Sequence, residues 1–136
     1  MTSGKFSISV HILTLLAGTD REWFPSEYLA GSININPVLV RKELINLKKQ
    51  GLIISKEGKS GGSALAKSAA LIRMSDIYNA VRPDHFLGKS INEPNPKCPV
   101  GKQINQHLEA LYIESEKALI ANLGKMTLAE FCQKFV

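Results

Sequence analysis

Cysteine is scarce in this chain of 136 residues, and long apolar runs are absent. The two cysteines, Cys98 and Cys132, are too few for the disulfide framework of a small secreted domain. No segment approaches the ~20 consecutive apolar residues of a membrane-spanning helix. The apolar stretch 6–17 is interrupted by polar residues and followed by charges, unlike a signal peptide. The sequence therefore predicts a cytoplasmic protein with no membrane partner.

The chain also lacks the residue patterns of a catalytic or metal site. Residues 58–60, Gly-Lys-Ser, match the end of a phosphate-binding loop, but Ile53 stands where that loop needs its first glycine. Two more glycines follow instead of a helix start. His11 and His107 have no cysteine or carboxylate at metal-ligand spacing. We therefore expect neither an enzyme nor a metal site, and we interpret the glycines as a turn.

Positive charge, by contrast, is concentrated in one stretch of the chain. The net charge is +5, and residues 41–67 hold seven Lys or Arg against two Glu. A basic cluster favours an acidic partner such as nucleic acid, although basic helix faces are also common on ordinary solvated surfaces. Whether the cluster binds nucleic acid or is an ordinary solvated surface therefore depends on where it lies in the fold.

Apolar spacing predicts a mostly α-helical fold with one small β-hairpin. We expect helices at 5–17, 27–30, 37–51, 75–83, 101–123 and 128–135, and strands at 52–55 and 63–66 around the glycine turn. Ser26 and Asn36 are the expected N-caps of the second and third helices, and Ser75 is expected to cap the fourth. Pro37 suits the first position of the third helix, because its missing N–H costs nothing there.

Helix, short helix, turn, basic helix and hairpin follow one another in the order of a winged helix-turn-helix. The third helix is the expected recognition helix, which would enter a major groove with its N-terminal side chains near base edges. The hairpin, or wing, would lie along the backbone or the minor groove. The residues expected to contact DNA are Ser26, Asn36, Pro37, Val38, Arg41, Lys42, Asn46, Lys48, Lys49, Lys56, Lys59, Ser60, Gly61 and Gly62.

We expect three parts along the chain: a DNA-binding domain at 1–82, an effector or sensor loop at 83–100, and a part at 101–136 that holds a dimerisation helix and a C-terminal helix. The helix at 101–123 would be ~35 Å long at ~1.5 Å per residue. A domain this small cannot cover such a helix, so its apolar stripe is expected to pair with a second copy of the chain. The stripe consists of Ile104, Leu108, Leu111, Tyr112, Leu119 and Leu123.

Four stretches resemble the Rrf-two family of bacterial transcription regulators: FSISVHILTLLA, PSEYLAGSININPVLVRKELINLKKQGLI, KEGKSGGSALAK and IRMSDIYNAV. The stretch NPKCPVG resembles the YwnA-like branch of that family. The resemblance implies a dimeric DNA-binding repressor or activator whose long helices pair, with an effector-sensing loop before them. Glu57 and Ser63 depart from the arginine and the aromatic residue that members often carry in the wing, so base contacts are not transferred from relatives.

Cys98 is the residue of the loop for which a sensing role is conceivable. Iron–sulfur members of the family carry three closely spaced cysteines there. This loop has one, with Asp84, His85 and Glu93 as other conceivable ligands, so no cofactor is expected. Lys97 and the following helix N-terminus favour the reactive thiolate. Oxidant sensing through Cys98, a small-molecule effector between loop and long helix, and a purely structural cysteine all remain open.

The sequence thus predicts a homodimeric, sequence-specific transcriptional regulator, preferably a repressor, with a pseudo-palindromic double-stranded DNA operator as its partner. One alternative is the same regulator acting as a thiol redox sensor through Cys98. A second alternative is a basic nucleic-acid- or protein-binding module without an operator. Such a module would bind any duplex with little preference, because phosphate contacts carry no sequence information.

Overall fold

The computed structural model describes residues 4–84, 86–87 and 92–135. The helices are α1 (Lys5–Leu16), α2 (Ser26–Ile33), α3 (Pro37–Lys49), α4 (Met74–Val81), α5 (Pro99–Leu123) and α6 (Leu128–Cys132), and a short 3-10 helix, η1, spans Ala69–Leu71. Strands β1 (Ile53–Lys56) and β2 (Gly62–Leu65) form an antiparallel hairpin. The predicted order of elements and the mostly helical fold with a hairpin wing are confirmed.

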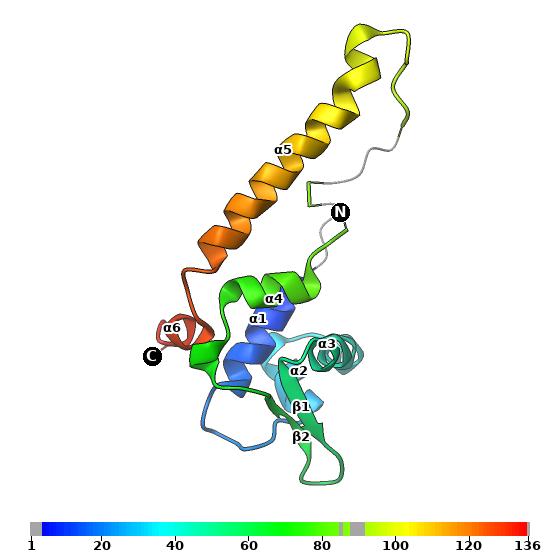
Figure 1. Ribbon diagram of the computed structural model, residues 1–136. Helices are drawn as coiled ribbons and strands as arrows, with labels where there is room; N and C mark the ends of the chain where they lie inside the picture. Colours follow the sequence, from blue (N-terminus) through cyan, green and yellow to red (C-terminus); the bar gives the residue numbers. More distant parts are fainter. Residues whose placement is uncertain (1–3, 85, 88–91, 136) are drawn as a thin grey trace.

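A single apolar core lies where α1, α2, α3, α4 and the base of the hairpin meet. Ile12 of α1, Leu29 of α2, Leu47 of α3 and Ile77 of α4 are fully buried in it. Each comes from the apolar face of an amphipathic helix, which is stable only when that face is covered by another element. This shared core joins the helix-turn-helix and the wing. Figure 1 shows their helices and strands grouped together in one part of the molecule.

The C-terminal helix α6 completes the same core. Leu128 is fully buried among the residues of the N-terminal helices. Its N–H donates to the carbonyl of Ile72 at 2.7 Å, and the N–H of Met74 donates to the carbonyl of Met126 at 2.9 Å. Helix α6 packs against α1 and η1. The helix ends at Cys132, three residues before its predicted end.

Helix α5 projects away from the rest of the molecule (Figure 1). It begins at Pro99, two residues before the predicted start, because proline suits the first helical position and Cys98 provides the N-cap. No residue of α5 is buried. The described residues between α4 and α5 form an irregular connection, as the four prolines of that stretch predicted.

Two of the predicted caps are wrong. Ser26 is the first residue of α2 rather than its cap, and the helix continues to Ile33, three residues beyond the predicted end. It stops at Asn34, whose φ of 62° lies in the left-handed region that asparagine tolerates better than most residues. Ser75 is buried inside α4, which begins one residue earlier, after Arg73.

Candidate nucleic-acid interface

The start of α3 is fixed by a local cap. The side-chain oxygen of Asn36 accepts a hydrogen bond from the N–H of Val38 at 2.8 Å, and Pro37 is the first helical residue. Both features match the prediction. Capping satisfies one of the backbone N–H groups that a helix start leaves without an intrahelical partner. The first turn of α3 is therefore held in place by its own sequence, with Asn36 and Val38 exposed.

The two faces of α3 differ sharply in charge. Val40 and Leu47 are fully buried, and Glu43, the only acid of the helix, is 7% exposed. The outward side of the helix carries its exposed side chains: Val38, Leu39, Arg41, Lys42, Ile45, Lys48 and Lys49. Because the single carboxylate is turned inward, this outward face carries four cations and no anion. A surface of this kind attracts a polyanion.

Arg41 lies beside the N-terminus of α2. Its guanidinium is 3.3 Å from the hydroxyl of Ser26, to which it donates, and 3.6 Å from the carboxylate of Glu27. Both members of the ion pair are more than half exposed, so water screens their attraction and the pair is easily released. The structure thus brings together two predicted DNA contacts, Ser26 and Arg41, where the N–H groups of a helix start favour an anion.

Asn46, also predicted to contact DNA, is directed elsewhere. Its side-chain nitrogen donates to the carbonyl oxygen of Ala80 in α4 at 2.9 Å, and the residue is half-buried. The amide therefore ties the recognition helix to α4. We leave Asn46 out of the set of residues that we propose to contact DNA.

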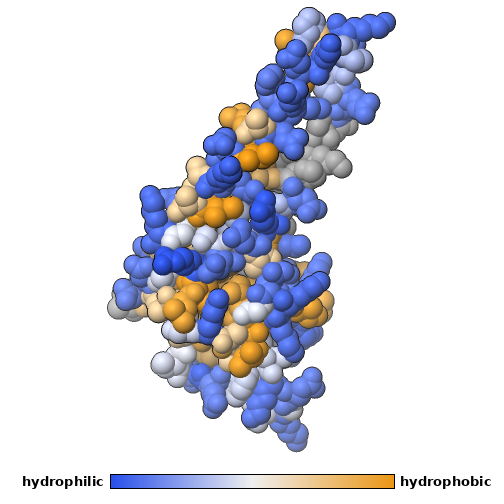
Figure 2. Space-filling model, in the orientation of Figure 1, coloured by the Kyte–Doolittle hydropathy of each residue, from blue (hydrophilic) through white to orange (hydrophobic). Residues whose placement is uncertain are grey.

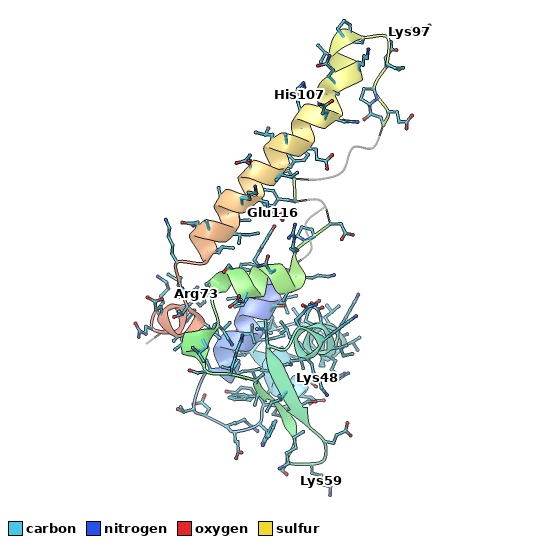
Figure 3. The ribbon with its side chains drawn as sticks, viewed as in Figure 1. Lys48, Lys59, Arg73, Lys97, His107 and Glu116 are labelled. Atoms are coloured by element: carbon cyan, nitrogen blue, oxygen red, sulfur yellow. The ribbon has the colours of Figure 1, made fainter. Side chains whose placement is uncertain are left out.

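The wing is joined to α3 by a side-chain contact. Lys48 donates to the hydroxyl of Ser55 on β1 at 2.7 Å. Figure 3 shows Lys48 near the junction of α3 and the hairpin, and Lys59 at the tip of the wing. Lys56 and Ser60 are likewise exposed. The predicted cations of helix and wing therefore belong to one connected surface.

The base of the wing is held by the segment before α2. Phe24 and Ser63 exchange two backbone hydrogen bonds, each 2.9 Å long. Gly62 has a φ of 148°, and a Cβ at this position would come within 2.5 Å of the carbonyl of Phe24. Only glycine fits such a close backbone approach. The glycines thus form a wing turn, as the sequence indicated, and not a phosphate-binding loop.

Two residues of this surface, Trp23 and Ile45, were not predicted from the sequence. Trp23 lies under the wing, with the ammonium of Lys56 5.8 Å from its ring centre, a cation–π contact. No local pattern joins residues so far apart in sequence. Ile45 could have been predicted from helical spacing. It falls outside the inward apolar positions Val40, Leu44 and Leu47, so its side chain has to point outward.

Helix α4 connects α5 to the recognition helix. Tyr78 donates its hydroxyl hydrogen to Glu116 of α5 at 3.0 Å, and Arg82 contacts the same carboxylate at 2.6 Å. Figure 3 shows Glu116 on the part of α5 that lies above α4. Burial, reinforced by the hydrogen bond to Glu116, raises the pKa of Tyr78 to about 12, although Arg82 opposes the shift. With the bond between Asn46 and Ala80, polar contacts run from α5 through α4 to α3.

The predicted apolar stripe of α5 is divided between three environments. Ile104, Leu108 and Tyr112 line a cavity of about 640 Å³ between α5 and the connection that precedes it. Leu123 packs against the core and Leu119 is half-buried. Leu111 points away from these contacts and is 57% exposed. The cavity lies between the loop and the long helix, the place considered above for a small-molecule effector.

Cys98 is exposed and reduced at the start of α5, and its sulfur accepts the N–H of Gly101 at 3.4 Å. Cys132 is half-buried, and burial raises the pKa of its thiol. Within the described residues, no three His, Cys, Asp or Glu side chains are grouped to hold a metal ion. His85, considered above as a ligand, lies outside the described residues. No described helix is long and apolar enough to cross a membrane.

Comparison with known proteins identifies the family. The model of the Rrf2 family, described as an iron-dependent transcriptional regulator, matches residues 2–134. The chain is 34% identical over 130 residues to YwnA of Bacillus subtilis (strain 168), which carries the name of an HTH-type transcriptional regulator. The match covers 96% of each chain.

Solved structures support the same conclusion. One crystal structure, of a protein described as DNA-binding, is 32% identical and superposes with a TM-score of 0.75, covering 93% of this chain and 97% of that one. CymR (YrzC), the global cysteine regulator of B. subtilis, shares the fold at 20% identity, with a TM-score of 0.72 and coverage of 100% and 98%. The relatives are transcriptional regulators and not enzymes. The chain therefore belongs to the Rrf2 family of winged helix-turn-helix transcriptional regulators.

Proposed function

We propose that this chain acts in the cytoplasm as a homodimer that binds a specific, pseudo-palindromic DNA operator and represses transcription there. The observation that carries the proposal is the outward face of α3. It presents Arg41, Lys42, Lys48 and Lys49 while Glu43 is buried. The wing, with Lys56 and Lys59, adjoins this face through the contact between Lys48 and Ser55. Helix and wing together suit the major groove and the neighbouring backbone of one half-site.

Within a half-site the cations would have different tasks. Arg41 and Lys42 belong to the N-terminal half of α3, from which side chains reach base edges, and both pair with guanine acceptors. Lys48 and Lys49 at the C-terminal end would contact phosphates, as would the wing cations. The start of α2, with Ser26, would receive a further phosphate, because its backbone N–H groups carry partial positive charge.

Dimerisation is supported by the exposure of α5. A helix of 25 residues with none of them buried, and with Leu111 largely exposed, leaves apolar area that a second copy would cover. A two-fold axis between paired α5 helices would direct two copies of α3 toward the same side of a duplex. A dimer bound across both half-sites would block access to promoter DNA, which is why we propose repression.

Selection from a pool of randomised duplexes of about 30 base pairs, long enough for two half-sites one turn apart, tests the proposal without knowledge of the operator. We expect enrichment of an inverted repeat. The enriched duplex should be bound far more tightly than a scrambled one, and Arg41→Ala and Lys42→Ala should each weaken its binding. Binding without enrichment of any sequence would contradict the proposal and favour the non-specific basic module.

Oxidant sensing through Cys98 is a second candidate function. Its sulfur is exposed at the start of α5, where an oxidant in solution can reach it. Within one chain Cys132 lies beyond the opposite end of α5, ~37 Å away along the helix. A disulfide of Cys98 would therefore have to join two subunits or a small thiol, and oxidation without a second thiol would give the sulfenic acid.

The test is the affinity of the enriched duplex before and after peroxide treatment of the protein. Sensing through Cys98 predicts a loss of affinity that Cys98→Ser prevents and that Cys132→Ser does not. An affinity unchanged by peroxide would remove this candidate and leave the DNA-binding proposal intact.

A further inference from the structure

Two apolar side chains lie in the middle of the basic face of α3. Val38 is 60% exposed and Ile45 is 70% exposed. They are seven residues apart, so they lie on the same side of the helix, ~10.5 Å from each other along its axis. At 100° per residue, Arg41 and Lys48 flank them on one side and Lys42 and Lys49 on the other. In Figure 2 hydrophobic residues (orange) lie next to hydrophilic ones (blue) at the position of α3.

These residues do not serve the core. The inward side of α3 is already occupied by Val40, Leu44 and Leu47. The partner that covers Val38 and Ile45 therefore has to offer apolar groups within a strongly anionic surface, because the flanking cations lie on both sides. The major groove of DNA combines these properties. Its floor carries an apolar group, the 5-methyl of thymine, between two rows of phosphates.

We propose that Val38 and Ile45 recognise thymines in the operator by van der Waals contact with their 5-methyl groups. The inference rests on the proposed entry of α3 into a major groove. The separation of the two side chains along the helix corresponds to about three base pairs, since successive pairs are ~3.4 Å apart. Recognition helices of the homeodomain type contact bases through positions i, i+3, i+4 and i+7, the spacing of Val38, Arg41, Lys42 and Ile45. Each half-site would thus contain two thymines whose 5-methyl groups contact Val38 and Ile45.

Deoxyuridine provides the test, because it keeps every hydrogen-bonding group of thymidine and lacks only the methyl. In the duplex enriched by selection, the thymines of one half-site are replaced one at a time by deoxyuridine. Loss of one buried methyl contact should weaken binding about fourfold. We expect this effect at two thymines about three base pairs apart, on either strand, and little effect at the others.

Variants assign each thymine to its side chain. Val38→Ala should abolish the penalty for deoxyuridine at one of the two positions, and Ile45→Ala at the other. Both residues are exposed on a helix, so alanine should leave folding intact, which thermal unfolding checks. Leu71→Ala removes an exposed apolar side chain outside α3 and should leave both penalties unchanged.

The possible outcomes distinguish a failure of the proposed thymine contacts from a failure of the proposed operator binding, on which this inference rests. Specific binding without a penalty at any thymine would overturn the inference and leave the regulator standing. Penalties that persist in both alanine variants would assign the methyl contacts to other residues and would also overturn it. Failure to enrich any duplex would overturn the proposed function and the inference together.

Discussion

At the scale of single residues, the buried hydroxyl of Ser9 in α1 lowers the stability of the fold. Its hydroxyl is fully buried and has no hydrogen-bond partner among the described residues. A buried hydroxyl without a partner loses its bonds to water and gains none in return. We expect Ser9→Ala to raise the free energy of unfolding by about 1 kcal/mol or more, helped by the higher helix propensity of alanine.

Urea denaturation measures the change, and Ser7→Ala is the matched control. The hydroxyl of Ser7 is exposed and already bonds the carbonyl of Gly4 at 3.2 Å, so its removal should change stability little. A Ser9→Ala protein less stable than the parent would contradict the interpretation.

Tyr78 gives a pH dependence with a definite sign. Its pKa is about 12 in the folded chain and 10.0 in the ordinary case, so between these values the unfolded chain has lost the proton that the folded chain retains. The stability contributed by the shift is complete below pH 10 and disappears as the pH rises toward 12. We therefore expect the stability of the parent protein to fall more steeply over pH 10–12 than that of Tyr78→Phe. Unfolding by urea at several pH values compares them, and parallel slopes would refute the expectation.

Caps show which residue roles are predictable from sequence. Asn36 and Pro37 were predicted correctly because their cap depends on neighbours in the chain. The start of α4 depends instead on distant contacts. Ile72 accepts a bond from Leu128, which holds the chain extended up to Arg73, and Asp76 then accepts the N–H of Arg73 at 2.8 Å. Local spacing contains no information about such a partner, so Ser75 was misassigned.

At the scale of elements, the wing depends on its contact with the segment before α2. We expect Gly62→Ala to lower the free energy of unfolding by about 2 kcal/mol or more, since the new Cβ clashes with the backbone of Phe24. Affinity for the enriched duplex should fall as well, because the wing would be displaced. Urea denaturation and DNA titration measure the two effects.

Gly31→Ala is the control for this substitution. Gly31 lies inside α2, and a Cβ there would meet nothing within 4 Å, so alanine should stabilise the protein by about 0.5–1 kcal/mol. If Gly62→Ala were as well tolerated as Gly31→Ala, the wing would not be held as described.

Helix α5 marks the limit of prediction from helical spacing. Its existence and its end at Leu123 follow from the apolar pattern. Which of its apolar residues meet the chain itself depends on how the preceding connection folds back, and no periodicity encodes that path. Ile104, Leu108 and Tyr112 therefore line the cavity, whereas Leu111 was the member of the stripe left largely exposed.

At the scale of the whole molecule, the proposed dimer should depend on the uncovered side of α5. We expect Leu111→Glu to be monomeric, because a carboxylate placed in an apolar interface loses its hydration without compensation. Light scattering should give a mass near 14.9 kDa for this variant and twice that value for the parent.

Gln106→Glu adds the same charge roughly half a turn round the helix and should remain dimeric. The monomeric variant should also lose most of its affinity for a two-half-site duplex, since the two recognition helices would no longer bind together. A Leu111→Glu protein that is still dimeric would exclude this side of α5 as the interface.

The burial of Leu128 also determines when a newly made chain becomes able to function. Ile12 and Leu128 are both fully buried in one core, yet translation at ~5–20 residues per second separates their synthesis by roughly 6 to 23 s. In the later part of that interval the recognition helix has already been synthesised, but the core against which it packs is still incomplete. We therefore expect the core of the DNA-binding unit to be completed only after Leu128 has been synthesised. Chains whose translation stops before Leu128 would lack this part of the core, and we expect them to bind the operator weakly.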